Sequence, residues 1–315
     1  MMRCGRSRAG LVRGARRCGL LALCVLCLGA PGSAVVIATG DGSGNTSAPP
    51  DDPGWAAVGL AGGLTGVYLG NGWVLTASHV GERAITFEGV TYQPVVGSKI
   101  QMMTSEAYTA DLIVYQIEGD PDLPAIVLAQ TPPVAGVDQV ILIGQGWNRE
   151  ATLTNWTSSF TEAPPGPIVY SGYKRATGRA LRWGQDVVTE TDRLIALAGH
   201  NTHSFLSRFD ASGSDVPDEA HAVNGDSGGA VFLKRGGSWE LVGILFARTT
   251  ETDQPVDTAV FGNESVSVDI SFYRDQILDA TAPPIPVLPL AALTALSGAL
   301  LVSARAALRS RHTRS

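Results

Sequence analysis

The chain has 315 residues, of which 44% are hydrophobic, and this is enough for one sizeable core or for two small domains that share an interface. Ten of the 23 Lys and Arg residues lie before residue 35 or after residue 284, whereas all 29 Asp and Glu lie between these ends, so the body carries a net charge of −16. A body this acidic repels nucleic acid and anionic lipid, which excludes both as expected partners.

Residues 1–34 have the layout of a secretory signal peptide. Six Arg without an acid precede an apolar run over residues 18–30, and small residues then lead to a cleavage site after Ala34. A membrane anchor is the alternative, but thirteen apolar residues are too few to span a bilayer comfortably. All four cysteines lie in this segment, so we expect no disulfide, thiolate nucleophile or cysteine-bound metal in the body. The segment predicts an exported protein that is periplasmic, on the cell surface or secreted.

The body, residues 35–281, has the pattern of many short β-strands. Apolar and β-branched runs alternate with Gly, Pro, Asn and Asp, which is typical of a β-sandwich or a β-barrel. Composition marks residues 40–54 as a loop, most of residues 160–185 as a long connection, and residues 272–278 as the one plausible helix. The predicted strands cover residues 66–69, 73–76, 112–117, 140–143, 230–233, 241–246 and 266–270.

Residues 282–315 form a tail with a Pro-rich start, an uncharged stretch over residues 285–302, and four Arg without an acid. Eighteen uncharged residues are near the lower limit for a transmembrane helix, and the basic end should stay cytoplasmic. The layout resembles the PEP-CTERM class of bacterial sorting signals, with Ile-Pro-Val-Leu-Pro-Leu in place of a Val-Pro-Leu-Pro-type motif. The resemblance implies recognition by sorting machinery at the inner membrane. A simple C-terminal anchor is the alternative.

Three segments of the body carry residues suited to nucleophilic catalysis. Residues 224–230 place Ser227 on a tight Gly-rich turn, where backbone N–H groups can face a developing oxyanion. Residues 73–80 deliver His79 at the end of a strand, and imidazole is a natural base at neutral pH. Residues 109–117 open an apolar strand with Asp111, whose charge near the core needs a partner. Taken singly, each segment also fits an ordinary turn, a solitary His or a strand-capping Asp.

Together these segments resemble the trypsin/chymotrypsin family of serine proteases. Residues 76–79 (Thr-Ala-Ser-His) are similar to its Thr-Ala-Ala-His motif, and residues 111–114 (Asp-Leu-Ile-Val) resemble its Asp-Ile-x-Leu motif. Residues 225–229 (Gly-Asp-Ser-Gly-Gly) are identical to its nucleophile motif, and residues 144–147 and 239–244 resemble two further family segments. The resemblance implies an all-β fold of two antiparallel six-stranded β-barrels with a short C-terminal helix. Residues 35–130 would form the first barrel and residues 131–281 the second.

The resemblance also implies a role for each site residue. Ser227 attacks the scissile carbonyl, His79 takes its proton, and Asp111 orients His79. The N–H groups of Gly225 and Ser227 form the oxyanion hole. Asp226 pairs with a newly formed N-terminal amine. No metal or other cofactor is implied.

The expected cleavage after Ala34 bears on activation. It would make Val35 the new N-terminus, 44 residues before His79, which is close to the separation found in the family. Removal of the signal peptide could then activate the enzyme without a further step. The alternative is that residues 35–54 are merely a linker.

The substrate pocket departs from the family pattern. His221 stands six residues before Ser227, where trypsin-like enzymes carry Asp, so specificity for Lys or Arg is not expected. Phe246, Ala247 and Arg248 replace the usual Ser-Trp-Gly, and Arg248 could narrow the pocket or favour an acidic side chain. We expect an acid-preferring pocket built from His221 and Arg248. A second pair, at residues 200 and 203, could be read as metal ligands, but a surface loop fits it better.

These observations predict an exported serine endopeptidase that acts on proteins or peptides. Two alternatives stay open. One is a non-catalytic binding module on the same fold, since a fold does not by itself determine function. The other is a surface or matrix protein that shares the C-terminal tail.

Overall fold

The computed structural model describes residues 35–211 and 216–283. The predicted signal peptide and all but the first two residues of the predicted tail lie outside this part of the chain. Within it, no helix has both the length and the apolar character needed to cross a membrane.

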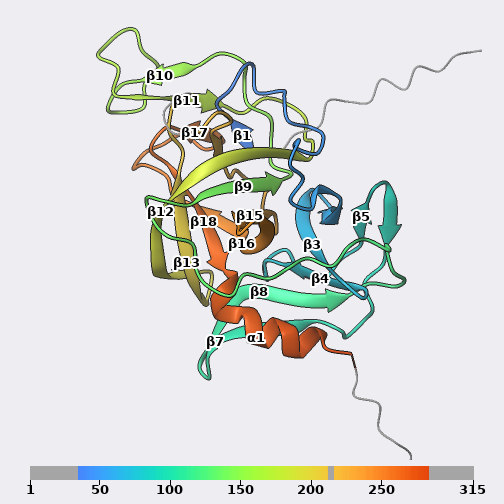
Figure 1. Ribbon diagram of the computed structural model, residues 1–315. Coiled ribbons are helices and arrows are strands. Elements are labelled where there is room, and N and C mark those ends of the chain that lie inside the picture. Colours follow the sequence, from blue (N-terminus) through green and yellow to red (C-terminus); the bar gives the residue numbers. More distant parts are fainter. Residues whose placement is uncertain (1–34, 212–215, 284–315) are drawn as a thin grey trace, which may run out of the picture. The chain divides into compact units, whose positions relative to one another are not determined.

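The first part of the described chain forms a seven-stranded sheet in the order β6-β5-β2-β3-β4-β8-β7 (Figure 1). A two-residue turn at Asn71 and Gly72, both with positive φ (50° and 75°), joins β3 to β4 and fixes their register. The next partner of β4 is β8, so these two strands lie side by side. The strands are β2 (Val58–Ala61), β3 (Leu64–Gly70), β4 (Trp73–Thr76), β5 (Ile85–Phe87), β6 (Val90–Tyr92), β7 (Ile100–Ser105) and β8 (Tyr108–Gln116).

The later strands close into a six-stranded antiparallel barrel in the order β12-β13-β18-β16-β15-β9. Irregularities in the β12–β13, β15–β16 and β16–β18 registers help long strands to curve around the barrel. The expected all-β class, C-terminal barrel and short helix are therefore confirmed. The strands are β9 (Gln139–Gly144), β12 (Arg182–Leu197), β13 (His200–Arg208), β15 (Ala230–Arg235), β16 (Ser238–Arg248) and β18 (Glu264–Asp269).

The N-terminal sheet differs in detail from the expected six-stranded barrel. It has seven strands, and β6 and β7 stand at its two ends. Both β5 and β6 are three residues long, and β5 meets β2 at a single register pair, Leu60 with Thr86. Strands this short offer few backbone groups for pairing, which explains why the hydrogen-bonded order ends there.

Two small sheets complete the described chain. β1 (Val36–Ile37) pairs with β14 (Ala220–His221), which attaches the start of the described chain to the barrel half. β10 (Thr154–Trp156), β11 (Tyr170–Lys174) and β17 (Thr258–Val260) form the other. The expected connection over residues 160–185 thus contains β11 and the start of β12. Gly172 lets β11 approach β17, because an added Cβ would lie 2.1 Å from the Ala259 carbonyl oxygen.

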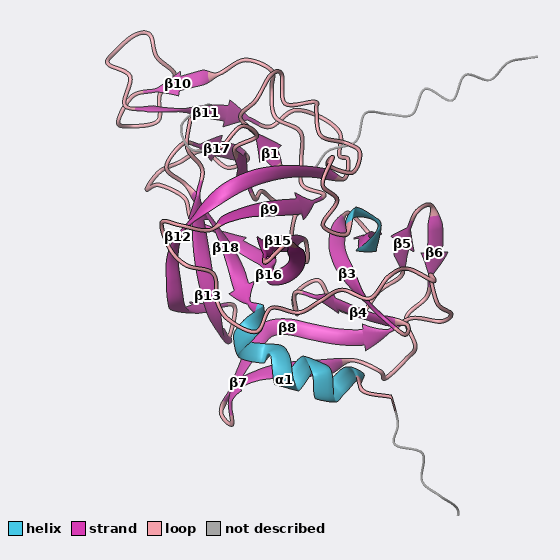
Figure 2. Ribbon diagram, viewed as in Figure 1, coloured by secondary structure: helices cyan, strands magenta, loops and turns pink. Residues whose placement is uncertain are grey.

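The one α-helix among the described residues, α1 (Ile270–Thr281), lies against β7 and β8 (Figure 2). The Asp269 carboxylate caps it by accepting a hydrogen bond from the Ser271 N–H at 2.9 Å. Ile270, Tyr273 and Ile277 are buried, and their i, i+3, i+7 spacing gives the helix one apolar face. This helix extends the predicted one at both ends.

One hydrophobic cluster spans the two halves, beside further clusters within each half. The spanning cluster combines Val58, Leu75 and Val114 from the seven-stranded sheet with Ile143 and Ile244 from the barrel. The residues predicted to act together come from both halves, and this shared packing fixes the distance between them.

Candidate active site

His79 and Asp111 are brought together by strand pairing. β4 and β8 set Thr76 opposite Ile113, so the residues that follow Thr76 run past Asp111. His79 Nδ1 lies 2.7 Å from Asp111 Oδ2, and the His79 backbone N–H donates to Asp111 Oδ1 at 2.9 Å. The Asp111 side chain is 1% exposed and the His79 side chain is 37% exposed. The carboxylate is therefore enclosed, while the imidazole reaches solvent.

Asp111 favours its charged form despite this enclosure. Burial raises the pKa of its carboxyl, but the hydrogen bonds and the charge interaction with His79 outweigh that effect, and the net pKa is below the usual value. The Asp111 backbone N–H donates to Thr202 Oγ1 at 2.9 Å, which ties β8 to β13 of the barrel. A charged carboxylate on Nδ1 holds the tautomer in which Nε2 is free to accept a proton.

Ser227 lies on the turn between β14 and β15, and the seven-stranded sheet holds that turn in place. The Thr65 N–H donates to the Ser227 carbonyl oxygen at 2.9 Å, and Thr65 Oγ1 donates to the same oxygen at 3.0 Å. Gly228 permits this approach, since its φ is +83° and an added Cβ would lie 1.9 Å from the Thr65 carbonyl oxygen. Thr76 Oγ1 in turn donates to that carbonyl at 2.7 Å. The nucleophile turn is thus joined to the strand that leads to His79.

The predicted oxyanion-hole donors are available. Within residues 35–211 and 216–283, neither the Gly225 N–H nor the Ser227 N–H donates a hydrogen bond. The Ser227 hydroxyl likewise has no hydrogen-bond partner among these residues, His79 included. In enzymes of this kind, the hydrogen bond between nucleophile and base is often long in the free enzyme and shortens when substrate binds.

Asp226 points into a backbone cradle. Its Oδ1 accepts from the Gly146 N–H at 2.6 Å, and its Oδ2 accepts from the Val223 N–H at 2.7 Å. An added Cβ on Gly144 or Gly146 would lie 2.4 or 2.5 Å from a carboxylate oxygen, so both glycines make room for this side chain. Burial raises the pKa of Asp226 to about 7 even though both hydrogen bonds act against it.

The first described residues lie close to this cradle. Val36 stands opposite His221 in the β1–β14 pair, and Val35 is fully buried. Val36 packs in the same apolar cluster as Val223, whose N–H binds Asp226. Residues 35–37 are consequently part of the folded body and not a loose linker.

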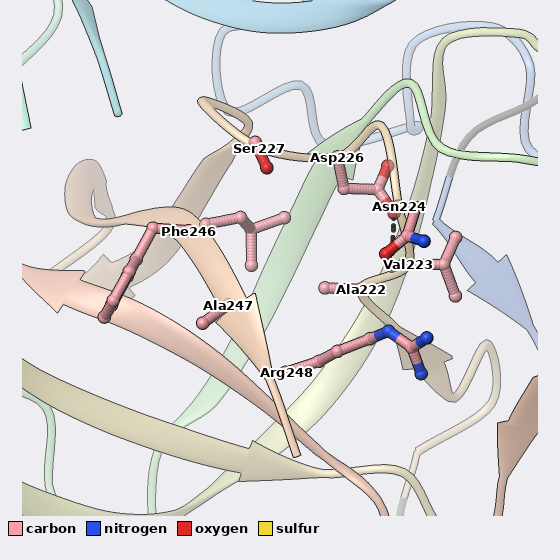
Figure 3. Close-up of a pocket in the computed structure, with 9 residues that line it drawn as sticks. Ala222, Val223, Asn224, Asp226, Ser227, Phe246, Ala247 and Arg248 are labelled. Atoms are coloured by element: carbon pink, nitrogen blue, oxygen red, sulfur yellow. Dashed lines mark hydrogen bonds between the residues drawn. The ribbon is translucent and has the colours of Figure 1, made fainter. Parts of the chain in front are cut away.

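A small pocket opens beside Ser227, with a volume of about 100 Å³ (Figure 3). Three of the four predicted pocket residues, Phe246, Ala247 and Arg248, line it. Figure 3 shows the Arg248 side chain extending from its strand beneath Ala222 and Val223. The other lining residues are Ala222, Val223, Asn224, Asp226, Ser227 and Leu245.

The fourth predicted pocket residue, His221, does not line the pocket and is fully buried. Its Nδ1 is 3.2 Å from Ser265 Oγ, and its ring stacks on Phe209 at a centroid distance of 5.4 Å. Burial first, and then the charge of Arg248, lowers the pKa of His221 to about 3. His221 is therefore neutral at ordinary pH and supplies no charge to the pocket.

The expected surface loop at residues 200–203 is in fact part of β13. His200 Nδ1 lies 2.7 Å from Thr109 Oγ1, and the His203 ring stacks on Phe272 at 3.7 Å. No group of three or more metal-ligating side chains occurs among the residues that the structure describes.

Sequence reasoning missed Arg179, which packs against the nucleophile turn. Its Nη1 donates to the Gly63 carbonyl at 2.8 Å and to the Gln145 carbonyl at 3.1 Å. An added Cβ on Gly225 would lie 1.9 Å from that same nitrogen. One side chain thus links both halves of the fold beside the predicted oxyanion hole. No local pattern marks Arg179, because its partners are distant in sequence.

Comparison with known proteins adds a family match. The family model described as "Trypsin" matches residues 42–264. A search of curated proteins finds no relative of significant similarity.

Solved structures similar to this chain include three proteases. The Rv3671c protease in its inactive form shares 15% identity, with 72% of this chain and 90% of that chain covered and a TM-score of 0.40. The NS6 protease from murine norovirus 1 shares 18% identity, with 71% and 94% covered and a TM-score of 0.39. Kallikrein-related peptidase 10 in complex with Zn²⁺ shares 16% identity, with 74% and 98% covered and a TM-score of 0.42.

Proposed function

Because this chain belongs to the trypsin family, which its residues 42–264 match, we propose that it is a serine endopeptidase that cleaves proteins or peptides. The observation that carries the proposal is the 2.7 Å contact between His79 Nδ1 and Asp111 Oδ2, made by an enclosed carboxylate and a solvent-accessible ring. Residues that match the family motifs in its order, His79, Asp111 and Ser227, support the same function.

In the proposed mechanism, Ser227 Oγ attacks the scissile carbonyl carbon while His79 Nε2 takes the hydroxyl proton. The tetrahedral oxyanion accepts hydrogen bonds from the free N–H groups of Gly225 and Ser227. The C–N bond then breaks, and His79 gives its proton to the leaving amine. Water, activated by His79, hydrolyses the acyl-enzyme and restores the Ser227 hydroxyl. Asp111 stabilises the imidazolium throughout both halves of the reaction.

A fluorophosphonate probe tests this function directly. The body would be produced in parallel with Ser227→Ala and with Ser238→Ala, the latter changing an exposed Ser at the start of β16. We expect labelling at Ser227 and peptide cleavage in the wild type and in Ser238→Ala, and neither in Ser227→Ala. A folded wild type that is not labelled would instead favour a non-catalytic binding module on this fold.

Export and activation form a second part of the proposal. We infer from the composition of residues 1–34 that they direct export, and from residues 282–315 that a sorting signal or anchor follows the body. Cleavage after Ala34 would create an amine at Val35, and this amine would pair with the buried Asp226 carboxylate. The register that sets Val36 opposite His221 supports this placement. Terminal sequencing of the active, exported protein tests it. An N-terminus well beyond residue 40 would reject Val35 as the activating residue.

A further inference from the structure

The pocket beside Ser227 has one cationic side chain among apolar and polar lining residues. Ala222, Val223, Leu245, Phe246 and Ala247 supply the apolar lining, and Arg248 supplies the charge. In the proposed mechanism, a pocket next to the nucleophile receives the side chain of the substrate residue whose carbonyl is attacked. The character of Arg248 therefore determines which substrates are accepted.

Arg248 is half-buried, and burial lowers the pKa of its guanidinium although the charges of Asp257 and Asp226 act in the opposite direction. Its Nη1 donates a hydrogen bond to the Thr258 carbonyl at 3.1 Å. Within residues 35–211 and 216–283, the Arg248 side chain makes no other hydrogen bond and forms no ion pair with a carboxylate. The Asp257 carboxylate next to Thr258 instead binds Arg175 at 3.0 Å. Nε and Nη2 of Arg248 remain available as donors.

Arg149 shows what a fully satisfied guanidinium looks like in this fold. It is buried, and its nitrogens donate to the carbonyls of Ile37, Ala38, Thr39 and Gly40 and to those of two further residues. Arg248 has no such set of carbonyls. Removing a guanidinium from water without an ion-pair partner costs free energy. The carboxylate of a substrate would offset this cost by accepting two parallel hydrogen bonds.

The acid that also lines the pocket, Asp226, is occupied elsewhere. Both its carboxylate oxygens accept backbone hydrogen bonds, from Gly146 and Val223. Among the described residues, Asp226 forms no ion pair with Arg248 and acts on it through its charge at a distance. His221 is buried and does not line the pocket, so Arg248 is the charged group left to meet a substrate.

We propose that Arg248 makes this pocket selective for an acidic side chain, so that the enzyme cleaves after Glu or Asp. The inference rests on the proposed peptidase function. The alternative is that Arg248 only narrows the pocket, and in that case the enzyme would prefer small neutral residues.

The test compares matched fluorogenic peptides that differ only in Glu, Gln or Ala before the cleaved bond. Their C-termini are amidated, so that only a side chain can supply a carboxylate. For the wild type we expect kcat/KM to be about tenfold to a hundredfold higher for Glu than for Gln, as for one charge-assisted hydrogen-bond pair. Arg248→Gln should bring this ratio close to one, and Arg248→Lys should restore part of it. Arg193→Gln, which removes an exposed Arg that pairs with Glu190 and does not line the pocket, should leave the ratio unchanged.

The outcomes distinguish the role of Arg248 from the peptidase function itself. Fluorophosphonate labelling of Ser227 without a preference for Glu over Gln would overturn the role of Arg248 and leave the peptidase function intact. A preference for Ala that Arg248→Gln abolishes would show that Arg248 acts by volume and not by charge. Absence of both labelling and cleavage would reject the proposed function itself.

Discussion

The Thr65 amide donates a hydrogen bond of 2.9 Å to the carbonyl oxygen of Ser227, across 162 residues of sequence. Thr65 belongs to β3 of the seven-stranded sheet, and Ser227 precedes β15 of the barrel. Thr76, three residues before His79, donates to the carbonyl of the same Thr65. A short hydrogen-bonded chain thus sets the position of the predicted nucleophile relative to the strand that carries the predicted base.

Gly228→Ala should break this connection. Its Cβ would lie 1.9 Å from the Thr65 carbonyl oxygen, and the backbone φ of +83° adds strain. We expect a loss of roughly 2–4 kcal/mol in the free energy of unfolding, because backbone atoms must move. Fluorophosphonate labelling should fall at least a hundredfold. Urea denaturation and labelling rates measure the two effects.

Gly237→Ala is the matched control for that change. Its φ is +88°, but nothing lies within 4 Å of an added Cβ. It should cost only the conformational strain, about 1–2 kcal/mol, and leave labelling unchanged. Equal effects of the two substitutions would show that the Thr65 contact is unimportant.

Asp111→Asn should impair catalysis while the protein stays folded. An amide in this place no longer holds His79 in the productive tautomer, so we expect kcat to fall about 10⁴-fold with little change in KM. The lowered pKa of Asp111 makes a second prediction. The stabilisation that its charge gives is present above the unfolded-state pKa and is lost as pH falls through the folded-state value. Unfolding curves of wild type and variant should therefore differ most near neutral pH and converge in acid.

Asp226 predicts a pH dependence of opposite sign. Burial raises its pKa to about 7, so the folded protein retains a proton that the unfolded chain releases between about pH 4 and 7. In protein that retains residues before Val35, stability should fall as pH rises through this window. The difference between wild type and Asp226→Asn isolates the effect, because His221 titrates equally in both.

Processing should change this pH dependence. If an amine at Val35 pairs with Asp226, the processed protein should lose most of the decline between pH 4 and 7. Urea denaturation at several pH values, on both forms, measures it. Identical slopes for both forms would exclude the proposed ion pair.

Arg179→Gln should loosen the contact between the halves. The change removes charge-assisted hydrogen bonds to the carbonyls of Gly63 and Gln145. We expect a loss of about 2–3 kcal/mol in the free energy of unfolding and a lower kcat, because Gly225 loses its packing partner. Arg193→Gln removes an exposed Arg that pairs with Glu190 and should change stability by less than about 1 kcal/mol. Equal effects of both variants would contradict the role of Arg179.

Several features of the fold could be read from local sequence. The strands that lead to His79 and follow Ser227 begin where their apolar runs predict, and the helix near the end of the body begins within two residues of the expected start. The strand expected to open at Asp111 begins earlier, at Tyr108, so Asp111 lies within β8 and not at its start. The hairpin of β12 and β13 was not predicted, because both strands carry many polar and charged residues between their apolar ones. β11 was not predicted either, because the composition of residues 160–185 is typical of a loop. Its Gly172 is needed for the close approach to β17.

The sequence alone determined which residues could carry chemistry, because a nucleophile turn, a strand-end imidazole and a strand-opening carboxylate each have a pattern only a few residues long. Only the tertiary structure decided which of these residues meet and what surrounds them. Arg248 lines the pocket whereas His221 is buried and does not line it, although both belong to the predicted pocket. Barrel closure and core packing set these contacts between distant segments, and no local preference of the backbone encodes them.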